Sequence, residues 1–156
     1  EESNSTLEDE VRHTENYLEL MKDRYEENLI YNIEEAGELE RVKVPRVILQ
    51  PIVENCFKHG FGENGFPWII HVAVTASYGH WRIHVRNNGR PFQEKDLTEL
   101  NEKVEGFLKG EQKKISGIGL TNTIIRLRLL YEEQVEYEIY TGNDGYTYVV
   151  LKGNYK

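Results

Sequence analysis

The sequence has little cysteine, no excess of positive charge and no long hydrophobic run. Cys56 is the only cysteine among 156 residues, so the chain cannot form an internal disulfide. Its apolar neighbours favour a buried structural thiol over a nucleophile. Nothing in this pattern indicates an oxidising compartment.

The charge balance excludes several classes of partner. There are 27 Asp and Glu against 19 Lys and Arg, a formal net charge of −8. Nucleic acids and anionic membranes select basic surfaces, so we expect neither as a partner of this chain, and an anionic ligand must be held by local groups. No apolar run reaches the roughly 20 residues of a membrane span, and the first ten residues lack the regions of a signal peptide. We therefore expect a soluble chain of one compact domain.

The first 28 residues read as a helical segment. Ser5 and Glu8 form a candidate capping box. A seam of apolar and small residues then recurs at steps of four and three, comprising Leu7, Val11, Thr14, Leu18, Met21 and Tyr25. Three heptads do not separate a coiled-coil dimer contact from a helix lying against its own domain, and both interpretations stay open.

A short strand at 29–33 and a charged connection at 34–43 lead to a helix that carries polar groups on one face. Pro45 suits the first turn of that helix. Its sequence at 49–61 is LQPIVENCFKHGF, with an apolar stripe of Ile48, Leu49, Ile52, Val53 and Cys56 and a polar stripe of Pro51, Glu54, Asn55 and Lys58. An amide oxygen can join a magnesium ion that already carries phosphate oxygens and water, and a lysine can face a phosphate. An ordinary amphipathic helix facing solvent is the alternative.

Two strands follow, with alternating apolar residues at 70–74 and at 81–85. The same alternation predicts that Asn87 points into the domain, just before a turn at Asn88-Gly89. Residues 93–108 have a weak helical pattern, and 109–116 have no clear apolar face, so we predict a mobile flap near 92–116. A β-hairpin with strands at 135–140 and 146–151 ends the chain.

A glycine turn, Ser-Gly-Ile-Gly at 116–119, precedes a helix with apolar residues at 120, 124, 127 and 131. The free N–H groups and positive dipole at a helix N-terminus bind phosphates without a basic surface, and glycine lets the backbone approach closely. This turn alone is weak support for a phosphate site, because similar turns often join ordinary elements.

Three segments together, LQPIVENCFKHGF at 49–61, VRNNGRPF at 85–92 and SGIGLTNTIIRLRLLY at 116–131, resemble the catalytic domain of LytS-type sensor histidine kinases in order and spacing. The stretch ENYLELMKDRYEENL at 15–29 also resembles that family. The resemblance implies an α+β fold, a two-layer sandwich whose mixed, mostly antiparallel sheet is covered on one face by helices. This is the Bergerat-type ATP-binding fold of type II topoisomerases, mismatch-repair ATPases and large heat-shock chaperones. Residues 29–156 would form it, with residues 1–28 as a helical extension from a dimerisation or linker region.

The resemblance also implies ATP and Mg²⁺ as cofactors. Asn55 falls where the family's asparagine binds magnesium, Lys58 and His59 fall near the phosphates, and Gly117 and Gly119 match the second glycine box. Candidate catalytic residues are Glu54, Asn55 and Lys58; candidate nucleotide contacts are Asn55, Lys58, His59, Asn87, Gly89, Gly117, Ile118, Gly119, Leu120 and Asn122. Glu54 either orients the attacking group or is only a solvated carboxylate.

The first glycine box departs from the family pattern. Most members carry Asp-x-Gly-x-Gly, whose aspartate accepts from the adenine amino group, whereas this chain has Asn87-Asn88-Gly89-Arg90-Pro91. The Asn87 amide can still accept from that amino group, and its nitrogen can donate to a ring nitrogen. Pro91 replaces a flexible glycine and stiffens the start of the flap.

The implied reaction moves the ATP γ-phosphoryl group to a histidine and then to an aspartate of a response-regulator receiver domain. The family's acceptor lies upstream in a Pro-His-Phe-like motif that does not occur here, and Arg12-His13-Thr14 does not match it. The resemblance further implies a homodimeric full-length protein, a bacterial membrane sensor with this domain in the cytoplasm. The alternative is a weak or inactive nucleotide-binding or scaffold module of the same fold. An ATP hydrolase is disfavoured, because Pro51 stands where that reaction needs a carboxylate.

Overall fold

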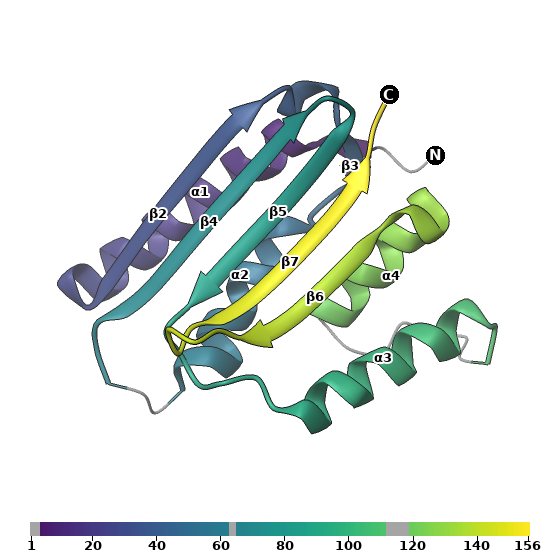
Figure 1. The fold of residues 1–156 in the computed structure, drawn as a ribbon. Helices are drawn as coiled ribbons and strands as arrows, with labels where there is room; N and C mark the ends of the chain where they lie inside the picture. Colours follow the sequence, from purple (N-terminus) through teal and green to yellow (C-terminus); the bar gives the residue numbers. More distant parts are fainter. Residues whose placement is uncertain (1–3, 63–64, 112–118) are drawn as a thin grey trace.

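The computed structural model describes residues 4–62, 65–111 and 119–156 as two layers, a five-stranded sheet and a set of helices (Figure 1). The strands are β1 (Asn4–Thr6), β2 (Leu29–Gly37), β3 (Lys43–Pro45), β4 (Trp68–Ser77), β5 (His80–Asn87), β6 (Glu136–Thr141) and β7 (Thr147–Asn154). The α-helices are α1 (Leu7–Tyr25), α2 (Leu49–Asn55), α3 (Glu94–Leu108) and α4 (Leu120–Tyr131). Short helical turns are η1 (Glu26–Asn28), η2 (Leu39–Arg41), η3 (Cys56–Phe61) and η4 (Glu132–Gln134), of which η3 is π-helical.

The main sheet has the strand order β2-β4-β5-β7-β6. Only β2 and β4 are parallel; the other neighbours are antiparallel. Helices α1, α2 and α4 lie behind this sheet in Figure 1, and α3 lies beyond its β6 edge. The predicted α+β sandwich with a mixed, mostly antiparallel sheet is therefore confirmed. A small second sheet of β1 and β3 was not predicted.

The strand patterns have the predicted sidedness. Ile70, Val72 and Val74 of β4 are buried against the helices, and so are alternate residues of β5 that end at Asn87. The alternation is local, because successive side chains of a strand point to opposite faces. It therefore predicts which face a residue occupies before the packing partner is known.

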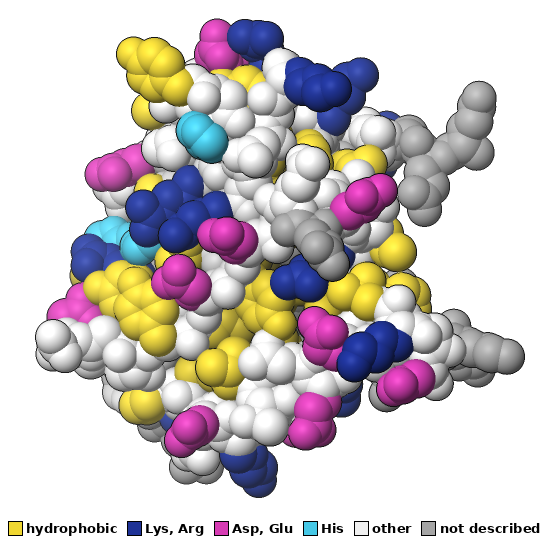
Figure 2. Space-filling view, turned by 45° about the vertical axis from the view of Figure 1, so that its right-hand side comes forward, with side chains coloured by type: hydrophobic (Ala, Val, Ile, Leu, Met, Phe, Trp, Pro, Cys, Tyr) yellow, Lys and Arg dark blue, Asp and Glu magenta, His cyan; other side chains and the backbone are white. Residues whose placement is uncertain are grey.

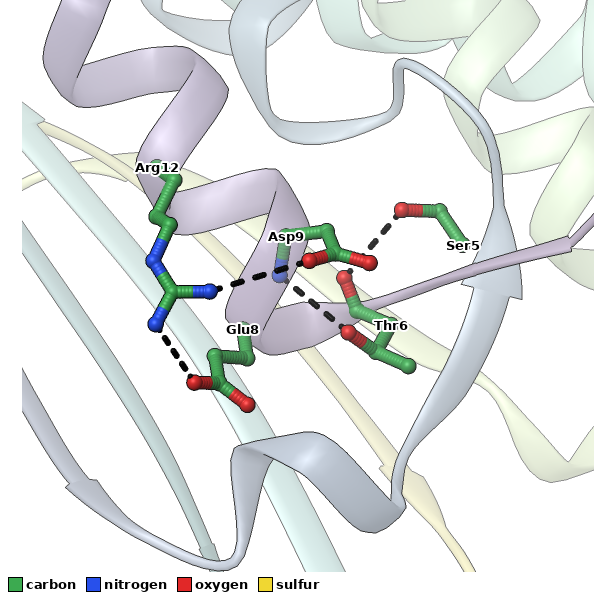
Figure 3. Close-up of polar contacts among 5 residues, drawn as sticks. All are labelled: Ser5, Thr6, Glu8, Asp9 and Arg12. Atoms are coloured by element: carbon green, nitrogen blue, oxygen red, sulfur yellow. Dashed lines mark hydrogen bonds and ion pairs between the residues drawn. The ribbon is translucent and has the colours of Figure 1, made fainter.

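The N-terminus of α1 differs from the prediction by one residue. Thr6, rather than Ser5, is the N-cap: its hydroxyl accepts from the Asp9 N–H at 3.2 Å (Figure 3). The Ser5 hydroxyl instead donates to the Thr6 carbonyl, and Glu8 pairs with Arg12 at 2.7 Å. The chain stays extended through Thr6 because residues 4–6 pair with β3, so the helix cannot begin earlier.

The α1 seam packs inside the domain. Leu7, Val11, Thr14 and Leu18 are buried, and α1 contacts α2 and β2. The interpretation of a helix lying against its own domain is thus the one that the structure supports. Because α2 and β2 already cover these residues, the alternative prediction of a coiled-coil contact through them is wrong.

Two other expectations need correction. Pro45 ends β3 rather than starting a helix, and α2 begins at Leu49, with Pro51 in its first turn, where no intrahelical donor is required. Strand β2 continues to Gly37, beyond the predicted end at Ile33. Longer pairing is possible because β4 provides a parallel partner residue for each position.

The predicted flap contains a regular helix. Residues 94–108 form α3, whose Leu100 and Val104 are buried, and α3 packs against α4. Residues 112–116 of the predicted flap lie outside the described residues. The weak helical signal therefore corresponds to a helix with a narrow apolar stripe.

Charge is interspersed on the face shown in Figure 2. Lys, Arg, Asp and Glu side chains alternate there around hydrophobic side chains in a central hollow. None of the helices in the described ranges has the length and apolar character needed to cross a bilayer. This face has no broad basic surface, in line with the expectation that an anion must be bound by local groups.

Candidate functional site

A pocket of about 340 Å³ opens between α2, α3, the paired ends of β5 and β7, and the start of α4. Its size is within the range of small-molecule sites. Ile52, Asn55, Cys56 and Gly60 come from α2 and η3, Asn87, Thr147 and Val149 from the sheet, and Leu120 and Thr121 from α4. Three of the segments singled out in the sequence thus meet at one cavity.

Helix α2 divides into the two predicted stripes. Leu49, Ile52 and Val53 are buried, whereas Asn55 is half-buried and lines the pocket. The Asn55 side-chain amide has no hydrogen-bond partner among the described residues, so it can bind a ligand without breaking an internal contact. The amphipathic helix is therefore not simply a solvent-facing one.

Glu54 and Lys58 are not among the described residues that line the pocket. Glu54 accepts a hydrogen bond from the Gln50 amide at 2.7 Å and lies close enough to Tyr17 to help raise its pKa. Burial is the main cause of that shift, which brings the Tyr17 pKa to about 12. Lys58 is exposed. Glu54 thus lies toward Gln50 and Tyr17 of α1 and not in the pocket lining, whereas the Asn55 side chain next to it lines the pocket.

The start of α2 is held by a carboxylate from α1. Glu10, 2% exposed, accepts backbone N–H bonds from Val47 at 3.1 Å, Ile48 at 2.6 Å and Leu49 at 3.2 Å. These are N–H groups that a helix start leaves without partners. Val47 has a φ of +56°, which is unusual for a β-branched residue, so the loop is strained where it meets Glu10. Arg126 of α4 donates to the carbonyl oxygens of Arg46 and Val47.

Sequence reasoning missed Glu10. It lies 37 residues before Val47, in the acidic first turn of α1, where a carboxylate is expected for the helix's own dipole. No local signal separates it from Glu8 and Asp9 beside it.

Asn87 is 5% exposed, lines the pocket and is held in one orientation by two hydrogen bonds. Its Oδ1 accepts the Gly89 N–H at 2.8 Å, and its Nδ2 donates to the Cys56 Sγ at 3.3 Å. Gly60 and Gly89 are required here for space: a Cβ at Gly89 would overlap the Gly60 carbonyl oxygen, and a Cβ at Gly60 would lie 3.0 Å from the Asn87 Oδ1. The predicted inward orientation of Asn87 is confirmed, and Gly89 acts through its contacts with Asn87 and Gly60.

Cys56 is a structural thiol that contacts Asn87 in the pocket lining. Burial raises its pKa from an ordinary value near 9 to about 12, and the hydrogen bond from Asn87 only partly offsets that effect. A thiol that stays protonated near neutral pH is a poor nucleophile. The expectation of a buried, unreactive cysteine therefore agrees with the structure.

The start of α4 presents free backbone donors to the cavity. Gly119, with a φ of +89°, is the N-cap, no side chain of the described residues caps the helix, and its first turn contains no acidic residue. Leu120 and Thr121 line the pocket, and the Asn122 Oδ1 is buried with no donor among the described residues. The positive end of the helix dipole thus faces the pocket. Gly117, Ile118 and the side chain of His59 lie outside the described residues.

Helix α3 supplies a wall that the sequence analysis did not assign. Asp96, Glu99, Leu100 and Lys103 line the pocket. Their spacing of three, one and three residues places them on one helical face. The spacing is visible in the sequence, but the polar face of a weakly amphipathic helix is normally expected to face solvent.

These residues suit a nucleotide with a magnesium ion. The described residues contain no group of three or more His, Cys, Asp and Glu that could hold a metal. A magnesium ion here would be held by Asn55 together with oxygens of phosphate and water, and phosphate and water oxygens are common Mg²⁺ ligands in nucleotide sites.

No family model matches the chain, but individual known proteins do. The sensor protein LytS of Oceanobacillus iheyensis is 30% identical over 144 residues, which are 92% of this chain and 24% of the relative. The sensor histidine kinase BtsS of Escherichia coli K12 is 26% identical over 147 residues, 94% of this chain and 23% of the relative. The chain thus spans about a quarter of the length of these relatives.

Solved structures share the fold. The catalytic domain of the histidine kinase ThkA has a TM-score of 0.60 at 16% identity, with 99% of this chain and 96% of that chain covered. The mycobacterial sensor histidine kinase MprB has a TM-score of 0.58 at 12% identity, covering 100% of this chain and 99% of that chain. The chain is a homologue of the LytS-type sensor histidine kinases and has the fold of a histidine kinase catalytic domain.

Proposed function

We propose that this chain is the ATP-binding catalytic domain of a two-component sensor histidine kinase. It transfers the γ-phosphoryl group of ATP to a histidine that these 156 residues do not include, and from there to an aspartate of a response regulator. One observation carries the proposal: a single pocket combines a buried amide, an unpaired Asn55 amide and an uncapped helix N-terminus.

Each part of the pocket has a distinct role. Phosphate oxygens accept from the backbone N–H groups at the start of α4, with Lys103 as a nearby cation. Asn55 holds a magnesium ion together with phosphate oxygens, and the ion neutralises charge on the phosphates. Phosphoryl transfer needs little covalent chemistry from the protein, so positioning by these groups accounts for most of the catalysis.

The roles of Glu54 and Lys58 remain proposals. Glu54 is adjacent to Asn55 in the sequence, and the hydrogen bond from Gln50 uses one carboxylate oxygen, so the other would accept from an incoming histidine. Lys58 is exposed and reaches a phosphate only by extending across the rim. By resemblance to the kinase family alone, His59, Gly117, Ile118 and Gly119 are further candidates for phosphate contacts.

The test is a calorimetric titration with ADP, with and without Mg²⁺. We expect Asn55→Ala to lose the magnesium-dependent part of the affinity, about tenfold or more, because a ligand of the ion is removed. Asn32→Ala on β2 is the matched control, since Asn32 is exposed and belongs to the opposite edge of the sheet. Retention of magnesium-dependent binding in Asn55→Ala would overturn the metal assignment.

A second candidate is a nucleotide-binding or scaffold module with weak or no turnover. Asn87 and Pro91, which replace the family's aspartate and glycine, favour it. The two candidates differ in phosphotransfer: radiolabelled ATP should label a longer form of the protein that contains the acceptor histidine. Nucleotide binding without labelling would support the module.

The partners follow from the relatives. A solved structure has ThkA in complex with the response regulator TrrA, and it matches 99% of this chain at 17% identity with a TM-score of 0.58. We propose a response-regulator receiver domain as partner and a homodimer for the full-length protein, formed by parts that precede this chain and not by the buried α1 seam. The domain would then lie on the cytoplasmic side of a bacterial membrane sensor.

A further inference from the structure

The loop that leads from β3 into α2 is bound on one side by α1. The Glu10 carboxylate accepts the N–H groups of Val47, Ile48 and Leu49, which belong to three consecutive peptide groups. In a trans peptide group the carbonyl oxygen points away from the N–H. The carbonyl oxygens of the same three peptide groups, those of residues 46, 47 and 48, therefore point away from Glu10.

Helix α4 binds these carbonyl oxygens from the other side. The Arg126 guanidinium donates to the carbonyl oxygen of Arg46 and, at 3.0 Å, to that of Val47. The Thr123 hydroxyl donates to the carbonyl oxygen of Ile48 at 3.4 Å. Helices α1 and α4 thus hold the same three peptide groups by opposite ends. A hydrogen bond on one side of a peptide group polarises it and strengthens the bond on the other side, most of all when the partners are charged.

The backbone of Val47 indicates that this loop is rigid. Its φ is +56°, which a β-branched residue rarely adopts, and its side chain is 53% exposed. An exposed side chain provides little packing energy to hold such a conformation. Strained backbone persists where the surrounding contacts determine it, and here those contacts come from both sides of the loop. The loop therefore joins α1 firmly to α4.

The helices that meet at this loop form two walls of the pocket. Helix α2 starts at Leu49 and carries Asn55 into the pocket lining, and the first turn of α4 faces the same cavity. In the proposed function, Asn55 binds the magnesium ion and the start of α4 binds the phosphates. Mg²⁺ requires nearly ideal octahedral geometry, with oxygens at about 2.0–2.1 Å. A small shift of α2 against α4 would therefore disturb the ion more than the rest of the ligand.

We propose that Glu10 and Arg126 are positioning residues, which act through the peptide groups of 46–49 to fix the spacing between the magnesium ligand on α2 and the phosphate-binding start of α4. This inference rests on the proposed nucleotide-binding function. Neither side chain is among the described residues that line the pocket, so both act through the backbone that they hold. Helix α1 thereby contributes to the phosphate end of the site without reaching the ligand.

Calorimetric titration of the whole chain with ADP, with and without Mg²⁺, tests the role of Arg126. The quantity compared is the magnesium effect, which is the dissociation constant without Mg²⁺ divided by that with Mg²⁺. Arg126→Ala should reduce this effect at least about fivefold, while the affinity without Mg²⁺ changes less than about twofold. The reason is that the variant frees α4 from the loop but keeps the N–H groups at its start. Circular dichroism at the titration temperature checks that the variant is folded.

Two further variants provide the control and the graded response. Arg82→Ala removes an exposed arginine on the outer face of β5, outside the pocket, and should leave the magnesium effect unchanged. Arg126→Lys keeps the charge but not the forked donor that binds two carbonyl oxygens. Its magnesium effect should lie between those of Arg126→Ala and the unmodified protein.

Glu10→Gln tests the other half of the pair. Because both side chains act on the same peptide groups, their effects should not multiply. The double variant with Arg126→Ala should lose no more than about twofold beyond the larger single loss. Glu19→Gln, at an exposed site of α1, is the matched control and should behave as the unmodified protein. If Glu10→Gln does not fold, the comparison of alanine and lysine at position 126 decides the inference.

The possible failures are distinguishable. An unchanged magnesium effect in Arg126→Ala overturns the inference and leaves the proposed function intact. An equal loss of affinity with and without Mg²⁺ also overturns it, because a general structural role would then suffice. Losses that multiply in the double variant refute the shared action through the peptide groups. Failure of the unmodified protein to bind ADP refutes the proposed function itself.

Discussion

Glu10 is the side chain whose replacement should most clearly reveal how α1 supports the start of α2. Its buried carboxylate accepts three backbone N–H groups at the start of α2, from Val47, Ile48 and Leu49. Hydrogen bonds to a charged group contribute about 1.5–3 kcal/mol each, against about 1 kcal/mol between neutral groups. The junction therefore depends on the charge as well as on the shape of the side chain.

Glu10→Gln keeps the size of the side chain and removes the charge. The single amide oxygen can retain the bonds from Ile48 and Leu49, but the new NH₂ group then faces the Val47 N–H, donor against donor. Two bonds weaken by about 0.5–2 kcal/mol each and a third is lost, so we expect a loss of about 3 kcal/mol in the free energy of unfolding. This is a large share of the stability of a small domain.

The measurement is urea unfolding followed by tryptophan fluorescence. The control is Glu19→Gln, the same change at an exposed site of α1, which should alter the free energy of unfolding by less than about 0.5 kcal/mol. If Glu10→Gln behaves like this control, the three hydrogen bonds do not hold the α1–α2 junction and the reasoning is refuted.

Three further predictions concern stability and catalysis. Burial raises the pKa of the Cys56 thiol from near 9 to about 12. The buried, protonated thiol therefore contributes fully to the free energy of unfolding below pH 9, and this contribution is lost as the pH rises toward 12. At pH 10 the loss is about 1.4 kcal/mol. Urea unfolding at pH 8 and 10 should show this extra loss in the unmodified protein and not in Cys56→Ala, and equal losses would contradict the assignment. Gly153→Ala should destabilise the fold by about 1–3 kcal/mol because its Cβ would overlap the Trp81 ring, whereas Gly65→Ala, with open space around it, should be near neutral; thermal or urea unfolding of both variants checks this. Glu54→Gln should leave ADP affinity nearly unchanged but slow phosphoryl transfer in a protein that includes the acceptor histidine, and equal rates would remove Glu54 from the mechanism.

The sequence by itself determined the elements whose signal is local. Period-two alternation in β4 and β5 predicted their inner faces, including the inward side chain of Asn87, and helical periodicity separated the two faces of α2. These inferences succeed because backbone geometry alone decides which residues share a face. The resemblance of three segments to a kinase family further implied that they contribute to one nucleotide site.

Only the tertiary structure decided what covers each face. The α1 seam is equally suited to a second helix in a dimer and to its own domain, and the packing of α1 on α2 selects the domain. The wall formed by α3 likewise depends on where that helix packs, since its polar face alone resembles a solvated surface.

The same holds for single polar groups. Glu8 and Asp9 beside Glu10 are equally suited to the first turn of a helix. Only the packing of α2 beside α1 makes Glu10 the buried carboxylate. The Asn87 amide is likewise oriented by Gly89 and by Cys56, 31 residues before it. The local sequence determines on which face of a helix or strand a residue lies. Its hydrogen-bond partner comes from a distant segment that it meets only when the domain folds. Burying a polar group is favourable only where such a partner satisfies it.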